Sequence, residues 1–208
     1  MRGRSRSSGR WLKEHFSDPF VKRAQSGTYR SRAIFKLEEI DRRVRLLRPG
    51  AVCLDLGAAP GAWSQYVSTR VTPNGRVVAT DIVAMAPLAG VEFVQGDFRT
   101  PHVFSQILAC CGRGAVDVLL SDMAPNFSGV DAIDQPRAMH LSELAIEMAR
   151  CALKPQGAAL IKVFQGAGFE TLLSRVRSLF SAVKLLKPQA SRSRSPELYL
   201  LAKALVMV

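Results

Sequence analysis

The chain has 208 residues, enough for one domain with a full hydrophobic core, whereas two independent domains would be cramped. It carries 29 Lys and Arg against 17 Asp and Glu, a net charge of +12, which favours a polyanion such as RNA or DNA as partner. We find no apolar run long enough to span a membrane, no signal-peptide pattern, and no CxxC or Cys/His ligand spacing. These absences predict a cytoplasmic protein that is neither exported nor membrane-bound and has no metal site.

The basic residues are clustered, which argues against charges that only solvate the surface. Residues 1–10 contain Arg, Ser and Gly without apolar spacing, and we expect a disordered basic arm there. An organelle transit peptide is the alternative, but Trp11 and Leu12 begin a more structured tract almost at once. The remaining clusters are Arg30 with Arg32, Arg42 to Arg48, and Arg192 with Arg194.

Residues 11–48 are predicted to form accessory helices ahead of the main domain, which we place at 49–208. A short helix is expected within 11–25, and Ser31 is a candidate N-cap for a helix over 32–40 with one apolar stripe. Lys36 lies off the centre of that stripe, so its local pattern indicates a solvated lysine. Pro49 and Gly50 end the segment and precede the first strand of the main domain.

The stretch 52–65 predicts a strand, a tight loop and a helix. Gly57 and Gly61 allow positive φ angles and a close approach of a ligand, and the N–H groups that open the helix point above the strand. The loop therefore predicts a nucleotide or cofactor site, although an ordinary strand-to-helix turn has the same local pattern.

Three later strands end in a carboxylate. Residues 76–81 end at Asp81, residues 91–97 at Asp97, and residues 116–122 at Asp122. Asp81 stands 24 residues after Gly57, about the offset at which an acid on the second strand meets ribose hydroxyls. Because the carboxyl ends of parallel strands line the ligand crevice, this series of acids predicts a binding site.

The second half continues the alternation of helices and strands. Lys162 lies in an otherwise apolar strand over 157–164, where it is either functional or an end-of-strand lysine that reaches solvent. The basic, serine-rich segment 191–197 could bind phosphates or form a surface hairpin. The other predicted elements are helices over 101–111, 135–153 and 168–180 and strands over 183–186 and 198–204.

Four motifs together resemble the FtsJ/RlmE family of S-adenosylmethionine-dependent RNA 2′-O-methyltransferases. The motifs are Asp55–Gln65, Ser121–Asn126, Lys162–Gly166, and Ser191–Arg194 with Glu197 and Tyr199. The similarity runs from Trp11 to the last strand. It implies an α/β, Rossmann-like methyltransferase fold: a mostly parallel seven-stranded sheet with an antiparallel last strand and helices on both faces.

The resemblance also implies an activity and a set of residues. A monomeric enzyme would methylate a uridine 2′-hydroxyl in 23S rRNA of the large ribosomal subunit, with S-adenosylmethionine as donor and no metal. The implied catalytic tetrad is Lys36, Asp122, Lys162 and Glu197. The implied donor-binding residues are Gly61, Trp63, Asp81, Asp97 and Asp122.

The chemistry requires a base, because a ribose hydroxyl is a poor nucleophile and must lose its proton as it attacks the methyl group. We assign Lys162 as the proton acceptor, oriented by Asp122, with Lys36 and Glu197 positioning the hydroxyl and the ribose. Burial beside a second cation, Lys36, is expected to lower the pKa of Lys162 from about 10.4, and Asp122 to oppose that shift.

Two alternatives remain from the sequence. A nicotinamide dehydrogenase would share the sheet and Asp81, but the loop is Gly-Ala-Ala-Pro-Gly rather than Gly-x-Gly-x-x-Gly, and no substrate domain follows. A non-catalytic RNA-binding ribosome-assembly factor would explain the charge, yet it would not need Lys162 or the series of acids.

Overall fold

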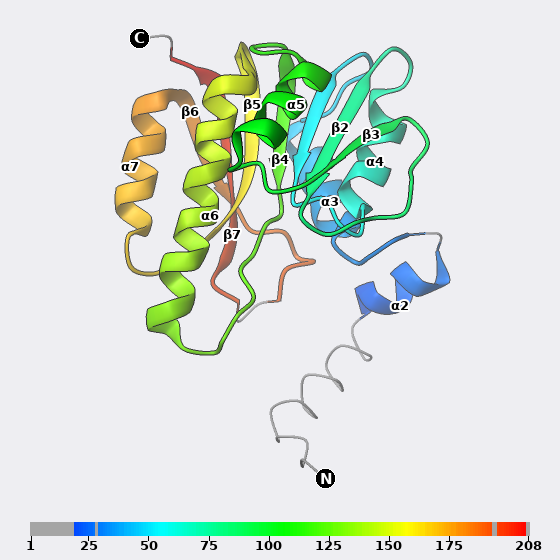
Figure 1. Cartoon of the computed structure of the whole chain (residues 1–208). Helices are drawn as coiled ribbons and strands as arrows, with labels where there is room; N and C mark the ends of the chain where they lie inside the picture. The colour runs from blue at the N-terminus through cyan, green and yellow to red at the C-terminus, as the bar shows by residue number, and fades with distance from the viewer. Residues whose placement is uncertain (1–18, 28, 193–194, 207–208) are drawn as a thin grey trace.

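The computed structural model describes residues 19–27, 29–192 and 195–206, so the predicted arm over 1–10 lies outside the described residues. Strands alternate with helices for most of this length (Figure 1). The strands are β1 (Val52–Leu56), β2 (Arg76–Asp81), β3 (Val91–Gln95), β4 (Val116–Ser121), β5 (Leu153–Phe164), β6 (Phe180–Leu186) and β7 (Glu197–Leu205). The helices are α2 (Pro19–Ser26), α3 (Ile34–Val44), α4 (Ala62–Val71), α5 (Pro101–Cys111), α6 (Asp131–Ala152) and α7 (Phe169–Leu179).

The strands form one seven-stranded sheet in the order β3-β2-β1-β4-β5-β7-β6. β1 to β5 run parallel, and β7 pairs antiparallel with both β5 and β6. The predicted fold class, including the antiparallel last strand, is confirmed.

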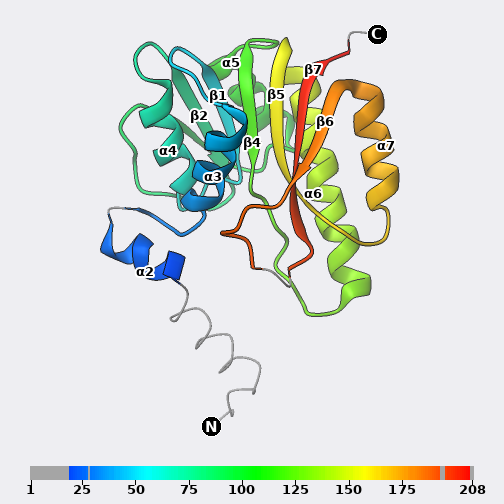
Figure 2. The ribbon, with the colours of Figure 1, turned by 180° about the vertical axis from the view of Figure 1, so that it is seen from behind.

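Helices cover both faces of the sheet (Figures 1 and 2). On one face α5, α6 and α7 pack through Ile107, Ile146 and Val176 against β-strand residues such as Leu119. On the other face α3 and α4 bury Leu37, Ile40, Trp63 and Val67 against alternate residues of the same strands. Successive strand side chains therefore enter two different cores, as the two-residue period of a strand requires.

The start of α3 differs from the prediction. The helix begins at Ile34 after Ala33, and Ser31 is not its N-cap. Ser31 Oγ instead accepts a hydrogen bond of 3.2 Å from the Ala33 N–H, so its side chain stabilises the turn before the helix. Serine serves both purposes with one oxygen, which is why the local pattern did not distinguish them.

Helix α6 also begins earlier than predicted, at Asp131 rather than near residue 135. The buried carboxylate of Asp134 accepts hydrogen bonds from the backbone N–H groups of Ser128 and Gly129, each 2.8 Å long. This side chain anchors the preceding loop against the first turn, so the helix extends to the exposed residues 131–133.

The order of the strands in the sheet places a crevice next to β1. From β1 the sheet extends through β2 and β3 on one side and through β4 and β5 on the other. Neighbouring loops at the carboxyl ends of β1 and β4 therefore leave in opposite directions, which is where open α/β sheets bind ligands.

Candidate active site

The glycine loop between β1 and α4 is tied to the end of β2. The N–H groups of Gly57 and Ala58 donate to the Thr80 carbonyl at 2.9 and 3.1 Å. Gly57 has φ +71°, and a Cβ added there would lie 2.4 Å from Met123 Cγ. A side chain at position 57 would therefore overlap the Met123 side chain in the loop that follows β4, so glycine is favoured on both conformational and steric grounds.

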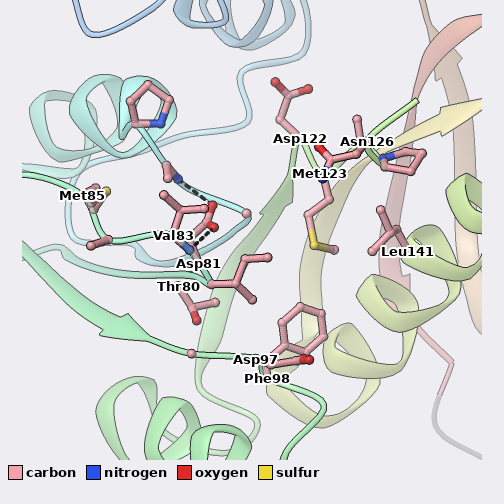
Figure 3. A pocket seen from close by; sticks show the side chains of 18 of the residues that line it. Thr80, Asp81, Val83, Met85, Asp97, Phe98, Asp122, Met123, Asn126 and Leu141 are labelled. Carbon is pink, nitrogen blue, oxygen red and sulfur yellow. Dashed lines mark hydrogen bonds between the residues drawn. The ribbon is translucent and has the colours of Figure 1, made fainter. Parts of the chain in front are cut away.

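A cavity of about 1040 Å³ opens at the carboxyl ends of β1, β2, β3 and β4 (Figure 3). Its polar wall includes the backbone of the glycine loop and the carboxylates that the sequence predicted. Among the lining residues are Gly57, Thr80, Asp81, Asp97, Asp122 and Met123.

Asp81 organises two walls of this cavity. Its Oδ2 accepts a hydrogen bond of 2.9 Å from the Ala59 N–H, and its Oδ1 accepts one of 2.8 Å from the Val83 N–H (Figure 3). Asp97, across the cavity, accepts bonds of 2.9 and 2.8 Å from Arg99 Nε. The Arg99 guanidinium lowers the pKa of the Asp97 carboxyl, which holds it ionised.

The cavity fits a nucleoside with an uncharged ring. Thr80 Oγ1 is the only buried side-chain nitrogen or oxygen without a hydrogen-bond partner in the part of the chain that the structure describes. Ile82 and Val83 leave 69% and 59% of their surface exposed on the same wall. Carboxylates and apolar side chains around one cavity, with the unpaired Thr80 hydroxyl buried in its wall, match the mixed surface of an adenosine-like ligand.

The four predicted catalytic residues meet at one end of this cavity. Lys162 Nζ lies 3.2 Å from Asp122 Oδ1 and 3.2 Å from Glu197 Oε2. Lys36 Nζ donates to Glu197 Oε1 at 2.7 Å. The order of contacts is Lys36, Glu197, Lys162, Asp122, and Asp122 also lines the cavity.

The sheet register explains why residues so far apart in sequence converge. Lys162 pairs with Tyr199 across β5 and β7, and Glu197 is two residues before Tyr199 on the same face. Leu160 and Leu120, two residues before Lys162 and Asp122, belong to the core under α3 and α4. The tetrad side chains of the sheet therefore share the face covered by α3, from which Lys36 reaches them.

The charge balance of the tetrad corrects one expectation. Burial lowers the pKa of the Lys162 ammonium, but Asp122 and Glu197 raise it by more, and the pKa lies above its ordinary value. The predicted lowering is wrong for the free protein, because Lys36 pairs with Glu197 and its charge is neutralised there. In the protein without ligand the Lys162 side chain is therefore protonated.

The pKa of Glu197 shifts in the opposite direction, downward. Burial raises the pKa of its carboxyl, whereas the charges of Lys162 and Lys36 and the hydrogen bonds from Lys36 and Ser191 lower it by more, to about 2. The Ser191 hydroxyl donates to Glu197 Oε1 at 2.7 Å. The Glu197 carboxyl is therefore ionised at neutral pH.

The low pKa of Glu197 predicts that the folded state loses stability in acid. A carboxyl whose folded-state pKa of about 2 lies below its ordinary 4.5 stabilises the fold above pH 4.5 and loses that contribution as the pH falls through 2. We expect wild type to exceed Glu197→Gln in free energy of unfolding by on the order of 3 kcal/mol at neutral pH, with a gap that narrows on acidification. Urea unfolding across this pH range measures the gap. Parallel profiles for the two proteins would contradict the prediction.

A second, smaller hollow of about 300 Å³ adjoins the tetrad from the other side. Lys36 and Glu197 line it together with Ser31, Arg32, Arg192 and Ser195. Three cationic side chains and two hydroxyls suit an anionic, hydroxyl-rich ligand. The tetrad thus joins the large cavity, which Asp122 lines, to a basic hollow, which Lys36 and Glu197 line.

Comparison with known proteins agrees with this geometry. A family model for FtsJ-like methyltransferases matches residues 29–205. The chain belongs to this family. Relatives named ribosomal RNA large subunit methyltransferase E, from Xanthomonas euvesicatoria and Stenotrophomonas maltophilia, are each 58% identical over 203 residues, which cover 98% of this chain and 97% of each relative.

A solved structure shares the fold of this FtsJ-like chain. The crystal structure of a putative ribosomal RNA methyltransferase from Plasmodium falciparum matches with a TM-score of 0.76 and 26% identity, and covers 86% of this chain and 100% of that one. Membership of the family excludes the nicotinamide dehydrogenase that the sheet alone would allow.

Two predicted donor-binding residues of this FtsJ-like methyltransferase lie outside the cavity wall. The Trp63 side chain is buried between α3 and β7, where Nε1 donates to the Ala33 carbonyl at 2.8 Å and the ring lies 5.7 Å from that of Tyr199. Gly61 precedes α4 just beyond the lining residues Ala59 and Pro60. Any contact of these two residues with a donor would run through the backbone at the start of α4.

Sequence reasoning missed two hydroxyl groups that hold the tetrad. Tyr199 Oη donates to Asp122 Oδ1 at 2.6 Å, and Ser191 supports Glu197 as described above. The spacing of Glu197 and Tyr199 in a predicted strand was an available signal, because residues two apart share a face. Among the described residues no cluster of three or more His, Cys, Asp or Glu side chains could hold a metal ion, and no helix is long and apolar enough to cross a membrane.

Proposed function

We propose that this protein transfers a methyl group from S-adenosylmethionine to the 2′-hydroxyl of a uridine in 23S rRNA of the large ribosomal subunit. The observation that carries the proposal is the position of the tetrad between the cavity and the basic hollow. A donor nucleoside in the cavity and an RNA ribose in the hollow would meet at Lys162 and Asp122.

The donor side would use the groups on the cavity wall. Asp81 would accept hydrogen bonds from the ribose hydroxyls, and Asp97 would lie near the adenine edge. Gly61 and Trp63 would contribute backbone groups at the start of α4. S-adenosylmethionine, when bound, supplies an electrophilic methyl group and a positive charge beside Asp122.

The acceptor side would use the lysines and Glu197. A cation next to Asp122 weakens its hold on the Lys162 ammonium, so the pKa of Lys162 falls when the cavity is filled. Neutral Lys162 Nζ would take the proton of the 2′-hydroxyl as the oxygen attacks the methyl carbon in line, while the methyl–sulfur bond breaks and S-adenosylhomocysteine leaves. Lys36 and Glu197 would hold the ribose, and this fixed geometry supplies much of the rate enhancement.

The RNA substrate is supported by charge and by the relatives. The net charge of +12 and the basic hollow suit a phosphodiester backbone. The two relatives at 58% identity are named as methyltransferases of large-subunit ribosomal RNA. We further propose that the protein acts as a monomer in the cytoplasm, where ribosomal subunits would be its substrate.

A methylation map tests the function. Ribosomal RNA from cells with and without the active protein should differ at one 2′-O-methyluridine of 23S rRNA, and purified protein should transfer labelled methyl groups to large-subunit particles that lack the mark. Identical maps, with RNA binding retained, would instead support a non-catalytic assembly factor.

A further inference from the structure

Arg30 joins two loops that are separate in sequence. Its Nη1 donates to the carbonyls of Pro60 at 2.9 Å and Ala86 at 2.7 Å, and its Nη2 donates to the Pro87 carbonyl at 2.7 Å. Pro60 belongs to the glycine loop, and residues 82–90 form the connection from β2 to β3. Arg30 itself lines the donor cavity.

The glycine loop leaves room for this side chain. Gly61 has φ +102°, and a Cβ added there would lie 2.9 Å from Arg30 Nη1 and 3.2 Å from Arg30 Cδ. The absence of a side chain at position 61 is thus a condition for the contact of Arg30 with the Pro60 carbonyl. This steric relation adds to the hydrogen bonds, because both place the Arg30 side chain against the glycine loop.

The backbone around Arg30 is anchored on both sides. The Arg30 N–H donates to Gln65 Oε1 in α4 at 3.2 Å. Two residues later, Arg32 donates to the Ala190 carbonyl in the segment that leads to Glu197. Residues 30–32 therefore contact loops of the donor cavity and of the basic hollow. These contacts fix the position of Arg30 beside the glycine loop.

The segment that Arg30 holds has few anchors of its own. Ile82 and Val83 are largely exposed, and residues 84–88 have no regular secondary structure. Three charge-assisted hydrogen bonds from one guanidinium are a substantial constraint on such a segment. Without them Ala86 and Pro87 would lose this link to the glycine loop, although Asp81 would still bond to Ala59 and Val83.

We propose that Arg30 is a positioning residue for the methyl donor, which fixes segment 82–90 against the glycine loop and thereby shapes the donor cavity. The proposal rests on the proposed function, because it takes the ligand of the cavity to be S-adenosylmethionine. Arg30 acts through the backbone of these loops and has no part in proton transfer. Its loss should therefore weaken donor binding and leave the chemical step intact.

Calorimetry with S-adenosylhomocysteine tests this role in the full chain. We expect Arg30→Ala to bind about tenfold more weakly than wild type, Arg30→Lys to recover part of the loss, and Arg42→Ala to match wild type. Arg42 is the matched control, because it is an exposed arginine that pairs with Glu38 at 2.7 Å away from the cavity. In kinetics the KM for the donor should rise while kcat at saturating donor stays close to wild type.

Two further measurements separate a positioning role from general stability. Hydrogen exchange of Arg30→Ala without ligand should accelerate in residues 82–90 and stay unchanged in β5. Gly61→Ala and Arg30→Ala should be non-additive in donor affinity, because both break the same contact. Equal affinity of Arg30→Ala and wild type, or unchanged exchange in 82–90, would overturn the inference. Failure of wild type to bind the probe would instead contradict the proposed donor, and the exchange measurement would still decide the role of Arg30 in the loop.

Discussion

Replacement of Lys162 by alanine is expected to reduce methyl transfer by about 10²–10⁴-fold and to leave donor binding within a few-fold of wild type. Lys162 contacts both Asp122, which lines the large cavity, and Glu197, which lines the basic hollow. Single-turnover transfer of labelled methyl groups to large-subunit particles measures the first quantity, and calorimetry with S-adenosylhomocysteine measures the second.

The same substitution removes a buried cation from two carboxylates, so a loss of folding has to be distinguished from a loss of chemistry. Lys162→Met keeps the side-chain volume, and Lys162→Arg keeps the charge but cannot accept a proton at working pH. Both variants should be as inactive as Lys162→Ala while still binding the donor product. Lys154→Ala is the control, because Lys154 lies on the same strand and pairs with Asp117 instead. Substantial turnover by Lys162→Met would disprove the assignment.

Replacement of Asp81 by alanine is expected to weaken donor binding by about 100-fold or more. The carboxylate of Asp81 holds the N–H groups of Ala59 and Val83, and each hydrogen bond to a charged group contributes about 1.5–3 kcal/mol. Its removal would therefore release two cavity walls and also remove the proposed partner of the donor ribose. Calorimetry with S-adenosylhomocysteine measures the loss of affinity directly.

Asp81→Asn refines this test. The amide can accept one of the two backbone hydrogen bonds, but its NH₂ group faces the donor N–H of the other, so most of the affinity should still be lost. Glu92→Gln is the matched control, because Glu92 is an exposed acid on the neighbouring strand β3. An Asp81→Asn protein with wild-type affinity would show that the carboxylate charge has no role in the donor site.

Most of the fold could be predicted because its signals are local. The apolar runs that end in Gly57, Asp81 and Asp122 predicted parallel strands with a ligand crevice at their carboxyl ends, and the sheet has that form. Helix boundaries were less predictable where one polar side chain could bond to more than one nearby backbone group. Asp134 extends α6 through the preceding loop, and Ser31 stabilises a turn rather than the helix that follows it.

In the candidate site, too, the local pattern around a residue did not determine its contacts. Lys36 lies off the apolar stripe of its helix, so its pattern alone indicated a solvated side chain, and only the resemblance to a family singled it out. In the structure its ammonium lies against Glu197, 161 residues away. Trp63 shows the reverse, because the motif that contains it predicted a ligand contact while its ring packs into the core under α3.

By itself the sequence determined the alternation of strands and helices, the glycine loop, the acids at the strand ends and the basic charge, since each depends on neighbouring residues or on composition. Only the tertiary structure decided the ionisation of Lys162 and the contacts of Arg30. Both depend on partners that strand register and loop packing bring within 3.2 Å: two carboxylates for Lys162 and three carbonyls for Arg30. The pKa of a buried group and the order of a loop follow from such distances, which no local pattern contains.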